Sequence, residues 1–549
     1  MKKIITKFGL FYRTIRYLKF VQIYRRIWFK FYRPRITSSL LPTVKDFHGL
    51  KTKPAEKHVS LIGSSEWILL NQRGKLDEIG WQNSSRSKLW RYNQHYFDDL
   101  NATGSKCRVN WHEGLIDRWI KDNPPFLGHG WEPYPTSIRI INWIKWSAQG
   151  GLLSKRAEEN LAMQVRWLRR RLEWHLLGNH LFMNAKALVF AGLYFDGLEA
   201  REWLTHGMRI IKGQIAEQIL PDGAQFELTP MYHALATEDM LDLINVCEAN
   251  AGKIAVDDMQ NIGEWRVLVK RMLEWLGCMS HPDRKISFFN DSAFGVAPIN
   301  QELYSYAKRL DILVSEPKIG ITNLNDSGYV RLQSENAVLI ADLGPIGPDY
   351  LPGHAHADTL SFELSVFGSR IFVNSGTSEY GISAERHRQR GTASHNTVCV
   401  DNQDSSEVWS GFRVGDRAKI TRKYLQDDGV VLHAHGEHNG YARIQRELRH
   451  SRKFALDDSS LRIVDNVSLP LNASARYHFH PDLFVEISGE NHGFIITKNG
   501  EKMKWNVSNA SSIELLSTTW HPEFGKVVPN KCLVANFNNQ VCSLKLMWG

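Results

Sequence analysis

The chain has 549 residues, of which 43% are hydrophobic and 23% are charged, as in globular proteins. This length exceeds what one hydrophobic core ordinarily supports, so two large domains are expected and a single small domain is excluded. The formal net charge of +10 favours an anionic partner, which is a nucleic acid, an anionic membrane surface or an acidic polymer.

Residues 1–36 are predicted to form a basic amphipathic helix, since no acidic residue precedes Asp46. Apolar residues recur at steps of four and three, with basic residues between them: Ile4, Phe8, Phe11, Ile15 and Leu18, and Lys2, Lys3, Lys7, Arg13, Arg16 and Lys19. Such a helix either lies on an anionic membrane surface or packs on the body of the protein through its apolar stripe.

The N-terminus lacks the uninterrupted apolar region and the cleavage site of a secretory signal. No run approaches the 18 apolar residues of a membrane span. The six cysteines are scattered without a CxxC pair, which indicates buried thiols in a reducing compartment. These features predict a cytoplasmic protein, attached peripherally at the inner membrane face if the helix binds lipid.

Residues 37–84 contain Pro42, Gly49 and Pro54 and are predicted to be a connector. Residues 85–320 follow a helical period, as in SKRAEENLAMQVRWLRRRLEWHL (154–176), and similar runs cover 204–219, 235–250 and 259–279. A long series of amphipathic helices without strands or a fixed repeat predicts an all-α layer structure, either a helical toroid or a solenoid.

The period changes to two over residues 325–549, which predicts an antiparallel β-sandwich. The segments expected to be strands are AVLIADLG (337–344), LSFELSVFGSRIFVNSG (360–376), HNTVCVD (395–401), LRIVDNVSL (461–469) and ARYHFHPDLFVEI (475–487). The fold class is therefore multidomain α+β, and the ligand site is expected in the cleft between the domains.

Five polar clusters carry the candidate chemistry. They are WEPYPTSIRIINW (131–143), LLGNHLFMNAKAL (176–188), DGAQFELTPMYH (222–233), GHAHAD (353–358) and SHNTV (394–398). Each also has a structural interpretation: Asn179 suits a helix N-cap and Tyr232 suits a hydrophobic core. In the fourth cluster His354 and His356 are expected to share one face of a strand, because side chains at i and i+2 point the same way.

In this order, GNH, ELTPMYH, GHAHAD and SHNTV resemble the heparinase II/III-like family of polysaccharide lyases over about residues 85–480. Relatives of this family include alginate lyases and C5-epimerases that act on uronic acids. The resemblance implies an (α/α) toroid joined to an antiparallel β-sandwich, and β-elimination on an anionic, uronic-acid-containing polysaccharide, so no nucleic acid partner is expected. The absence of a signal peptide favours a role beside capsule or exopolysaccharide synthesis. The alternatives are a uronate C5-epimerase and a non-catalytic glycan-binding or membrane-associated assembly protein.

Elimination requires neutralisation of the uronate carboxylate, removal of the C5 proton and protonation of the departing O4. The resemblance implies that Asn179 and His180 hold the carboxylate and that Tyr232 is the general acid, and on some substrates also the base. His354 would be the opposing base or charge neutraliser, and Tyr380 would support the site. A protonated His180 or His354 would lower the pKa of Tyr232. The predicted substrate-binding residues are Glu132, Arg139, Gln225 and Glu227.

The resemblance also implies one zinc ion, held by His356, residue 374 and His395. Residue 374 is Asn here, where the family has Asp, and an amide oxygen is a poorer zinc ligand than a carboxylate. Asp358 or Asp401 would be a substitute. The alternative is a metal-free hydrogen-bond network.

Overall fold

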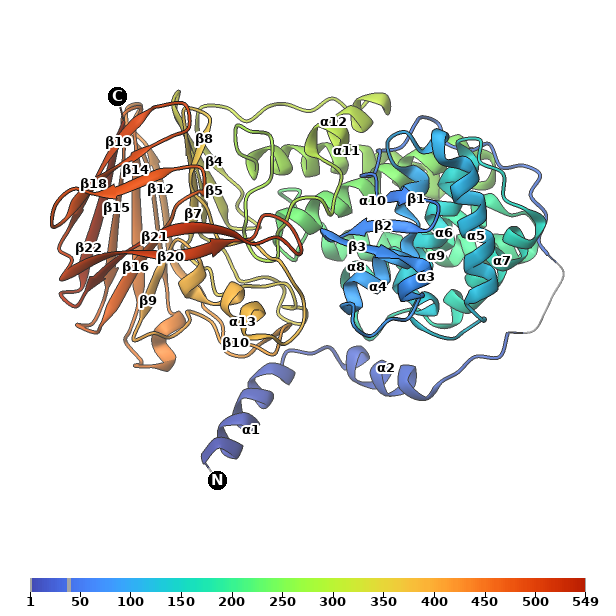
Figure 1. The fold of residues 1–549 in the computed structure, drawn as a ribbon, viewed down its shortest axis with the longest axis horizontal. Coiled ribbons are helices and arrows are strands. Elements are labelled where there is room, and N and C mark those ends of the chain that lie inside the picture. The colour runs from blue at the N-terminus through green and yellow to red at the C-terminus, as the bar shows by residue number, and fades with distance from the viewer. Residues whose placement is uncertain (1, 37–40, 549) are drawn as a thin grey trace.

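The computed structural model describes residues 2–36 and 41–548, and the side chains from residue 9 onward. Residues 37–40 of the predicted connector and the side chains of Lys2, Lys3, Ile4, Lys7 and Phe8 therefore lie outside the described part. Figure 1 shows a helical domain beside a β domain, with the first two helices running below both of them.

The helical domain contains the toroid helices that the sequence predicts. The helices are α4 (Lys88–Tyr96), α5 (Val109–Asp122), α6 (Pro133–Ala148), α7 (Lys155–Arg170), α8 (Gly178–Tyr194), α9 (Leu198–Gln218), α10 (Pro230–Ala249), α11 (Val256–Cys278) and α12 (Asn300–Arg309). In α7 the hydroxyl oxygen of Ser154 accepts from the backbone N–H of Ala157, and Leu161, Val165 and Leu168 are fully buried. The helix thus starts at a side-chain cap and follows the apolar period.

The predicted connector has more structure than expected. Residues 61–79 form a small antiparallel sheet of β1 (Leu61–Gly63), β2 (Glu66–Leu69) and β3 (Gln72–Lys75), followed by α3 (Leu76–Ile79). Trp67 and Leu76 of this unit are buried in the core of the helical domain. The sequence did not predict these strands, because each covers only three or four residues and so shows too short an alternation of apolar and polar residues.

The β domain is built from antiparallel sheets, as predicted. An eight-stranded sheet has the order β12-β13-β14-β15-β22-β19-β18-β17, and its partners are a five-stranded sheet β4-β5-β6-β7-β8 and a four-stranded sheet β20-β21-β16-β9. The rings of Phe362 in β7 and Phe454 in β14 lie 5.5 Å apart within one hydrophobic core, so the sheets pack face to face.

The strand bounds follow the predicted segments closely. The strands are β4 (Gly320–Asn323), β5 (Tyr329–Gln333), β6 (Ala337–Asp342), β7 (Phe362–Val366), β8 (Ser369–Phe372), β9 (Val398–Val400), β10 (Val408–Trp409), β11 (Arg413–Val414), β12 (Ile420–Asp427), β13 (Leu432–His438), β14 (His450–Leu456), β15 (Ser460–Val467), β16 (Ala473–His478), β17 (Phe484–Ile487), β18 (His492–Ile496), β19 (Lys502–Ser508), β20 (Ser512–Trp520), β21 (Val528–Phe537) and β22 (Val541–Trp548). One helix, α13 (Ala384–Arg390), lies within this domain.

The basic N-terminal segment forms two helices, α1 (Lys2–Ile15) and α2 (Phe20–Phe31), where one was predicted. Polar groups attach α1 to the β domain: Arg13 Nη2 lies 2.7 Å from Glu407 Oε1, and Trp409 Nε1 donates to Thr14 Oγ1. Phe11 and Ile15 of the predicted apolar stripe remain exposed. These two residues of the stripe are therefore not buried against the body, whereas Arg13 and Thr14 of the same helix contact it.

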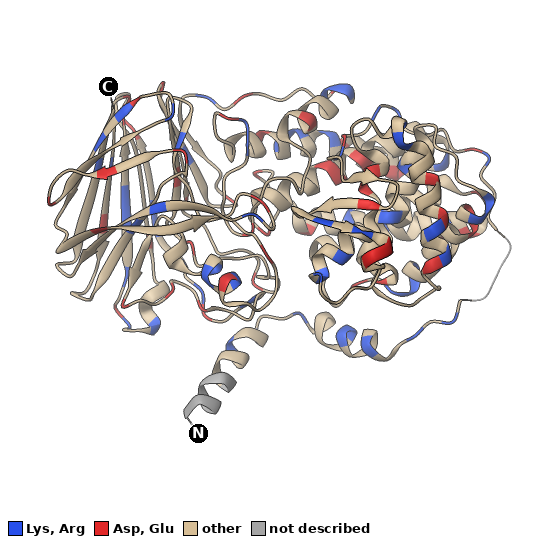
Figure 2. Ribbon diagram, viewed as in Figure 1, with Lys and Arg blue, Asp and Glu red and all other residues tan. Residues whose placement is uncertain are grey.

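Figure 2 shows basic and no acidic residues along α2 and along the coloured part of α1. Among the described residues, no helix has the length and apolar content needed to cross a bilayer. The cysteines are free thiols, and all except the exposed Cys107 are buried, as the sequence predicts.

Candidate active site at the domain interface

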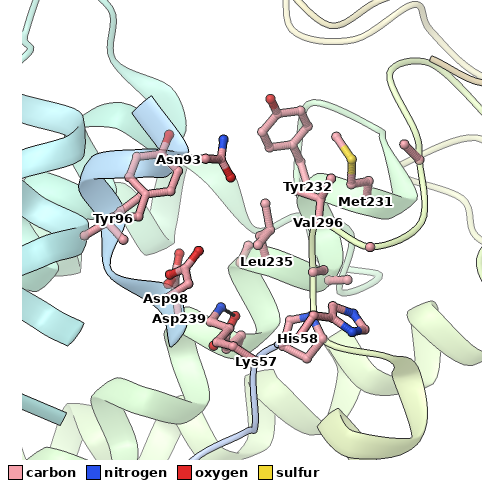
Figure 3. A pocket seen from close by; sticks show the side chains of 18 of the residues that line it. Lys57, His58, Asn93, Tyr96, Asp98, Met231, Tyr232, Leu235, Asp239 and Val296 are labelled. Atoms are coloured by element: carbon pink, nitrogen blue, oxygen red, sulfur yellow. Dashed lines mark hydrogen bonds and ion pairs between the residues drawn. The ribbon is translucent and has the colours of Figure 1, made fainter. Parts of the chain in front are cut away.

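A cavity of about 670 Å³ lies between the toroid helices and the β domain. Asn179, Gln225 and Tyr232 line it from the helical domain, and Tyr380 lines it from the β domain. Figure 3 shows Tyr232 at one side of the cavity, with Asp98, Asp239 and Lys57 gathered at another. The volume is in the range of small-molecule sites, so the cleft between the domains is the candidate active site, as predicted.

Asn179 and His180 lie in the first turn of α8. The preceding Gly178 has a φ of +53°, and a Cβ there would clash with the side chain of Leu351, so this position favours glycine. The Asn179 backbone N–H donates to Glu227, and the His180 ring lies 4.5 Å from the ring of Tyr134. A helix N-terminus favours an anion, so this turn suits a carboxylate.

Tyr232 lies in the first turn of α10, where Thr229 Oγ1 accepts from its backbone N–H at 2.9 Å. Its hydroxyl is 2.9 Å from that of Tyr380, which comes from the other domain. The Tyr232 ring also lies 4.0 Å from the ring of His354. The two tyrosines and one histidine predicted as catalytic are therefore in direct contact.

Asp291 connects the histidines of the GHAHAD cluster. Its Oδ2 lies 2.9 Å from Nδ1 of His354, and its Oδ1 lies 2.8 Å from Nε2 of His356. The guanidinium of Arg386 donates to both carboxylate oxygens. Residues 353–361 form turns before β7, so the prediction that both histidines share a strand face is wrong. A common acceptor, Asp291, brings them together instead.

The pKa shifts follow from burial and from this network. Burial would raise the pKa of Asp291, but Arg386 and the hydrogen bonds from His354 and His356 hold it well below its usual range. Burial, with the neighbouring Tyr380 hydroxyl, raises the pKa of Tyr232 well above that of a free phenol. Histidines do not lower it as the sequence suggested, because burial dominates. Tyr232 is therefore protonated at neutral pH.

The predicted substrate-binding residues divide into two groups. Gln225 lines the cavity and donates to Glu227, whose Oε2 lies 3.8 Å from Nε2 of His354. Arg139 is fully buried: its Nη2 donates to the carbonyl of Gly130, and its guanidinium lies 3.8 Å from the ring of Trp119. The prediction that Arg139 binds substrate is wrong, because these core contacts occupy the guanidinium.

Glu132 is not among the residues that line the cavity. Its carboxylate receives hydrogen bonds from Lys88 and Tyr92 and contacts Nδ1 of His129 at 2.6 Å. These contacts fix the entry into α6, where Glu132 is the residue before the helix. The structure thus gives Glu132 a role in positioning α6.

The two histidines predicted to bind zinc face each other, with Nδ1 of His356 3.0 Å from Nε2 of His395. Burial lowers the pKa of both rings, that of His356 to about 4, so both are neutral at pH 7. His395 Nδ1 then donates to the Gly391 carbonyl and His356 Nε2 donates to Asp291. The two facing nitrogens are left as bare acceptors, an arrangement that suits a shared proton or a bound cation.

Asn374 does not complete a metal site in this arrangement. Its amide oxygen accepts from the Asn396 backbone N–H, and its amide nitrogen donates to Ser361. The substitute Asp358 accepts from the Asn290 backbone N–H, and Asp401 lies in a turn after β9. Over the residues that the structure describes, no group of three His, Cys, Asp or Glu side chains is placed to hold a metal ion. Zinc binding stays a prediction that rests on two histidines.

Asp291 and Arg386 are the residues that the sequence interpretation missed. Asp291 follows a short apolar pair in FFNDSAFG, and Arg386 is one of three closely spaced arginines in AERHRQR. Neither segment has a periodic pattern that marks a site. In the structure Asn290, which precedes Asp291, has a positive φ without being glycine, a backbone conformation that the sequence pattern does not indicate.

Comparison with known proteins agrees with this architecture. The family model described as Heparinase II/III N-terminus matches residues 153–312, and the one described as Heparinase II/III-like, C-terminal, matches residues 316–548. Together these cover more than half of the chain, which therefore belongs to the heparinase II/III-like family.

The relatives share a low identity with this chain. A heparin-sulfate lyase of Bacteroides stercoris is 24% identical over 349 residues, covering 60% of this chain and 49% of that protein. A heparin-sulfate lyase of Pedobacter heparinus is 26% identical over 250 residues, covering 41% of this chain and 36% of that protein. The matched regions thus span about half or less of these curated relatives. A crystal structure of heparinase III has a TM-score of 0.69 at 16% identity, covering 95% of this chain and 89% of that chain, which shows the common fold.

Proposed function

We propose that the protein is a polysaccharide lyase that cleaves an anionic, uronic-acid-containing polysaccharide by β-elimination. The observation that carries this proposal is the contact of Tyr232 with Tyr380 and His354 across the domain interface, where both tyrosines line one cavity. Tyr232 as the acid and His354 as the base, close to the N-termini of α8 and α10, match what the elimination requires.

In the proposed reaction the uronate carboxylate lies at the first turn of α8, near Asn179 and His180. Donation from His354 Nδ1 to the ionised Asp291 leaves the Nε2 lone pair free to accept the C5 proton. The electron pair of that C–H bond forms the C4–C5 double bond as the C4–O4 bond breaks. Tyr232 gives its hydroxyl proton to O4, and Tyr380 hydrogen-bonds to Tyr232 throughout.

The direct test is incubation of the protein with a panel of uronic-acid polymers while the absorbance of the unsaturated 4,5 product is followed. Growth of this absorbance on at least one polymer, and its loss in Tyr232→Phe, is the expected result. The absence of any unsaturated product across the panel would contradict the proposal.

Two other functions share the fold and make different predictions. A C5-epimerase removes the same proton but returns one to the other face of C5, so in heavy water it would place deuterium at C5 without cleaving the chain. A non-catalytic glycan-binding or assembly protein would do neither. The joint presence of Asn179, His180, Tyr232 and His354 favours the enzymatic functions, because a binder needs no acid–base pair. A role beside capsule or exopolysaccharide synthesis stays a prediction.

We also propose that the N-terminal helices attach the protein to an anionic membrane surface. On α2 the exposed apolar side chains recur at helical spacing along one face: Phe20, Ile23, Tyr24, Ile27, Trp28 and Phe31. The same segment carries Arg25, Arg26 and Lys30 and no acidic residue. An exposed apolar stripe flanked by cations is the pattern of helices that lie in the lipid interface.

A further inference from the structure

The eight-stranded sheet of the β domain has one face in the hydrophobic core and one face in solvent. Ile463 of β15 and Leu544 of β22 are buried in the core that this sheet shares with the other sheets, whereas Arg462 and Lys545, next to them in the chain, are exposed. Figure 1 shows the sheet at the side of the β domain away from the helical domain. Its outer face therefore lies apart from the candidate active site.

Four basic side chains form a row on this outer face, here called the basic row. They come from the adjacent strands β14, β15, β22 and β19, and all four are exposed: Lys453, Arg462, Lys545 and Lys504. Arg462 and Lys545 are directly opposite each other, and Lys453 and Lys504 are each offset by two residues from the position opposite the next member. Opposite residues in a sheet have Cβ atoms about 5 Å apart and offset ones lie about 7–8 Å apart, so the row is continuous.

The basic row has no acidic partner in these four strands. Within their bounds, all of which the structure describes, the only acidic residue is Asp465, which is buried and accepts hydrogen bonds from Arg452. Asp457, in the turn after β14, accepts from the hydroxyl groups of Ser459 and Ser460 instead. The row thus presents uncompensated positive charge to solvent.

This arrangement does not stabilise the fold. Like charges directly opposite each other in a sheet are destabilising, and Arg462 with Lys545 is such a pair. A surface that gathers charge of one sign attracts partners of the opposite sign. An anionic ligand therefore accounts for the row, whereas packing does not.

A linear polyanion fits the basic row better than a membrane does. Within their described bounds the four strands expose no large hydrophobic side chain, and a peripheral membrane site needs apolar groups that enter the lipid. Those groups are on α2 instead. Asn506, which is opposite Lys545, and Asn466 of β15 are exposed on the same face, and their amide groups can hydrogen-bond to sugar hydroxyl groups.

We propose that the basic row is a second binding surface for the anionic polysaccharide, which holds part of the chain outside the active site. This inference rests on the proposed lyase function, because that function supplies the polyanion. A chain held at the row keeps its other units at a high local concentration near the cavity. The row therefore matters for a long polymer and not for an oligosaccharide that only the cavity binds.

The binding test uses the triple variant Arg462→Gln, Lys545→Gln and Lys504→Gln. The ligands are a long alternating polymer of glucuronate and N-acetylglucosamine and the tetrasaccharide of the same polymer. Calorimetry is done in the Tyr232→Phe background, so that turnover does not consume them. We expect the triple variant to bind the polymer about tenfold more weakly, since each exposed charge contributes modestly, and the tetrasaccharide equally well. Equal polymer affinity with and without the row, or no polymer binding at all, would overturn the proposal.

The matched control removes the same charge from the helical domain. Glutamine at the exposed Lys155, Lys270 and Lys308 should leave the polymer affinity unchanged. An equal loss in this control would show an effect of net charge alone and would overturn the row. The melting temperature of the row variant should not fall, because the substitutions separate like charges.

Vesicles of phosphatidylcholine and phosphatidylserine test a membrane as the other occupant of the row. The row variant should bind them as the parent protein does, because the apolar stripe of α2 is retained. Lost vesicle binding with intact polymer binding would assign the row to a membrane and overturn the proposal.

Turnover separates this inference from the proposed function. With Tyr232 present, the row variant should show a KM for the polymer about tenfold higher at the same kcat, as expected when binding outside the reacting centre is lost. Row-dependent polymer binding without any unsaturated product would contradict the lyase and support the row. Product formation with the same KM in both proteins would support the lyase and overturn the row.

Discussion

The Nδ1 atom of His354 lies 2.9 Å from Oδ2 of Asp291, and this contact fixes which ring nitrogen carries the proton. Because Arg386 holds the pKa of Asp291 well below its usual range, the carboxylate accepts and Nδ1–H donates. The Nε2 lone pair of His354 is thereby left free, as a general base requires. The arrangement resembles other catalytic histidines whose tautomer a buried aspartate sets.

Asp291→Asn should therefore lower turnover by about 10²–10⁴-fold, because an amide also accommodates the wrong tautomer of His354. The same change leaves Arg386 buried without its carboxylate, so the variant should also lose about 3–5 kcal/mol of stability. Turnover per folded molecule, with thermal unfolding measured in parallel, separates the two effects. Near-normal turnover in folded Asp291→Asn would show that Asp291 does not position the base.

Tyr232→Phe removes one hydroxyl and should lower turnover by about 10²–10⁴-fold while the fold persists, since positioned acid catalysis is worth this factor. Tyr380→Phe is the matched control: it breaks the same 2.9 Å hydrogen bond but leaves the proposed acid in place, so its loss should be smaller. Initial rates of unsaturated product formation measure both. A larger loss in Tyr380→Phe than in Tyr232→Phe would exchange the roles of the two tyrosines.

His233, next to Tyr232, should make stability depend on pH. Its Nδ1 accepts from the Gln225 N–H and its Nε2 donates to the Met272 carbonyl, and burial lowers its pKa to about 4. A depressed histidine pKa stabilises the fold above the unfolded pKa of about 6.5, and this contribution is lost as pH falls towards 4. Between pH 7 and pH 5, the free energy of unfolding in urea should fall by about 2 kcal/mol more in the wild type than in His233→Gln. An equal pH dependence in both proteins would contradict this role.

The zinc prediction depends on Asn374. Because its amide oxygen is held by Asn396 and carries no charge, we expect the wild type to retain much less than one zinc per chain after purification. Asn374→Asp adds the missing charge and should raise both the zinc content and the melting temperature in the presence of zinc. One zinc per chain in the wild type, lost in His395→Ala, would instead favour the metal site.

The membrane proposal predicts salt-sensitive binding to vesicles that contain anionic lipid. Replacing Ile27 and Phe31 of the α2 stripe by serine should lower the partition coefficient about tenfold or more, since less apolar area enters the lipid. Binding by the wild type should weaken as salt rises. Serine at the exposed Val430 and Val527, far from α2 in the sequence, is the control and should change nothing. Equal binding by both double variants would contradict the proposal.

The sequence by itself determined the two domains, their order and several of their elements. The helical period places Leu161, Val165 and Leu168 of α7 in the core, and the alternation at 461–469 becomes β15. These patterns are local, because burial of one face of a helix or strand fixes the spacing of its apolar residues. The motifs also predict Tyr232, His354 and Tyr380 as site residues.

Only the tertiary structure decided which polar residues meet. Asp291 is 63 residues from His354 and 95 from Arg386 in the chain, and no spacing rule connects such partners. The lack of a spacing rule also explains the wrong prediction for Arg139. In the sequence it lies among aromatic residues and was expected to bind substrate, but in the structure its guanidinium stacks on Trp119 in the core. A side chain's charge can be recognised in a sequence, but whether water, substrate or a buried carbonyl satisfies that charge depends on the packing of segments distant in the chain.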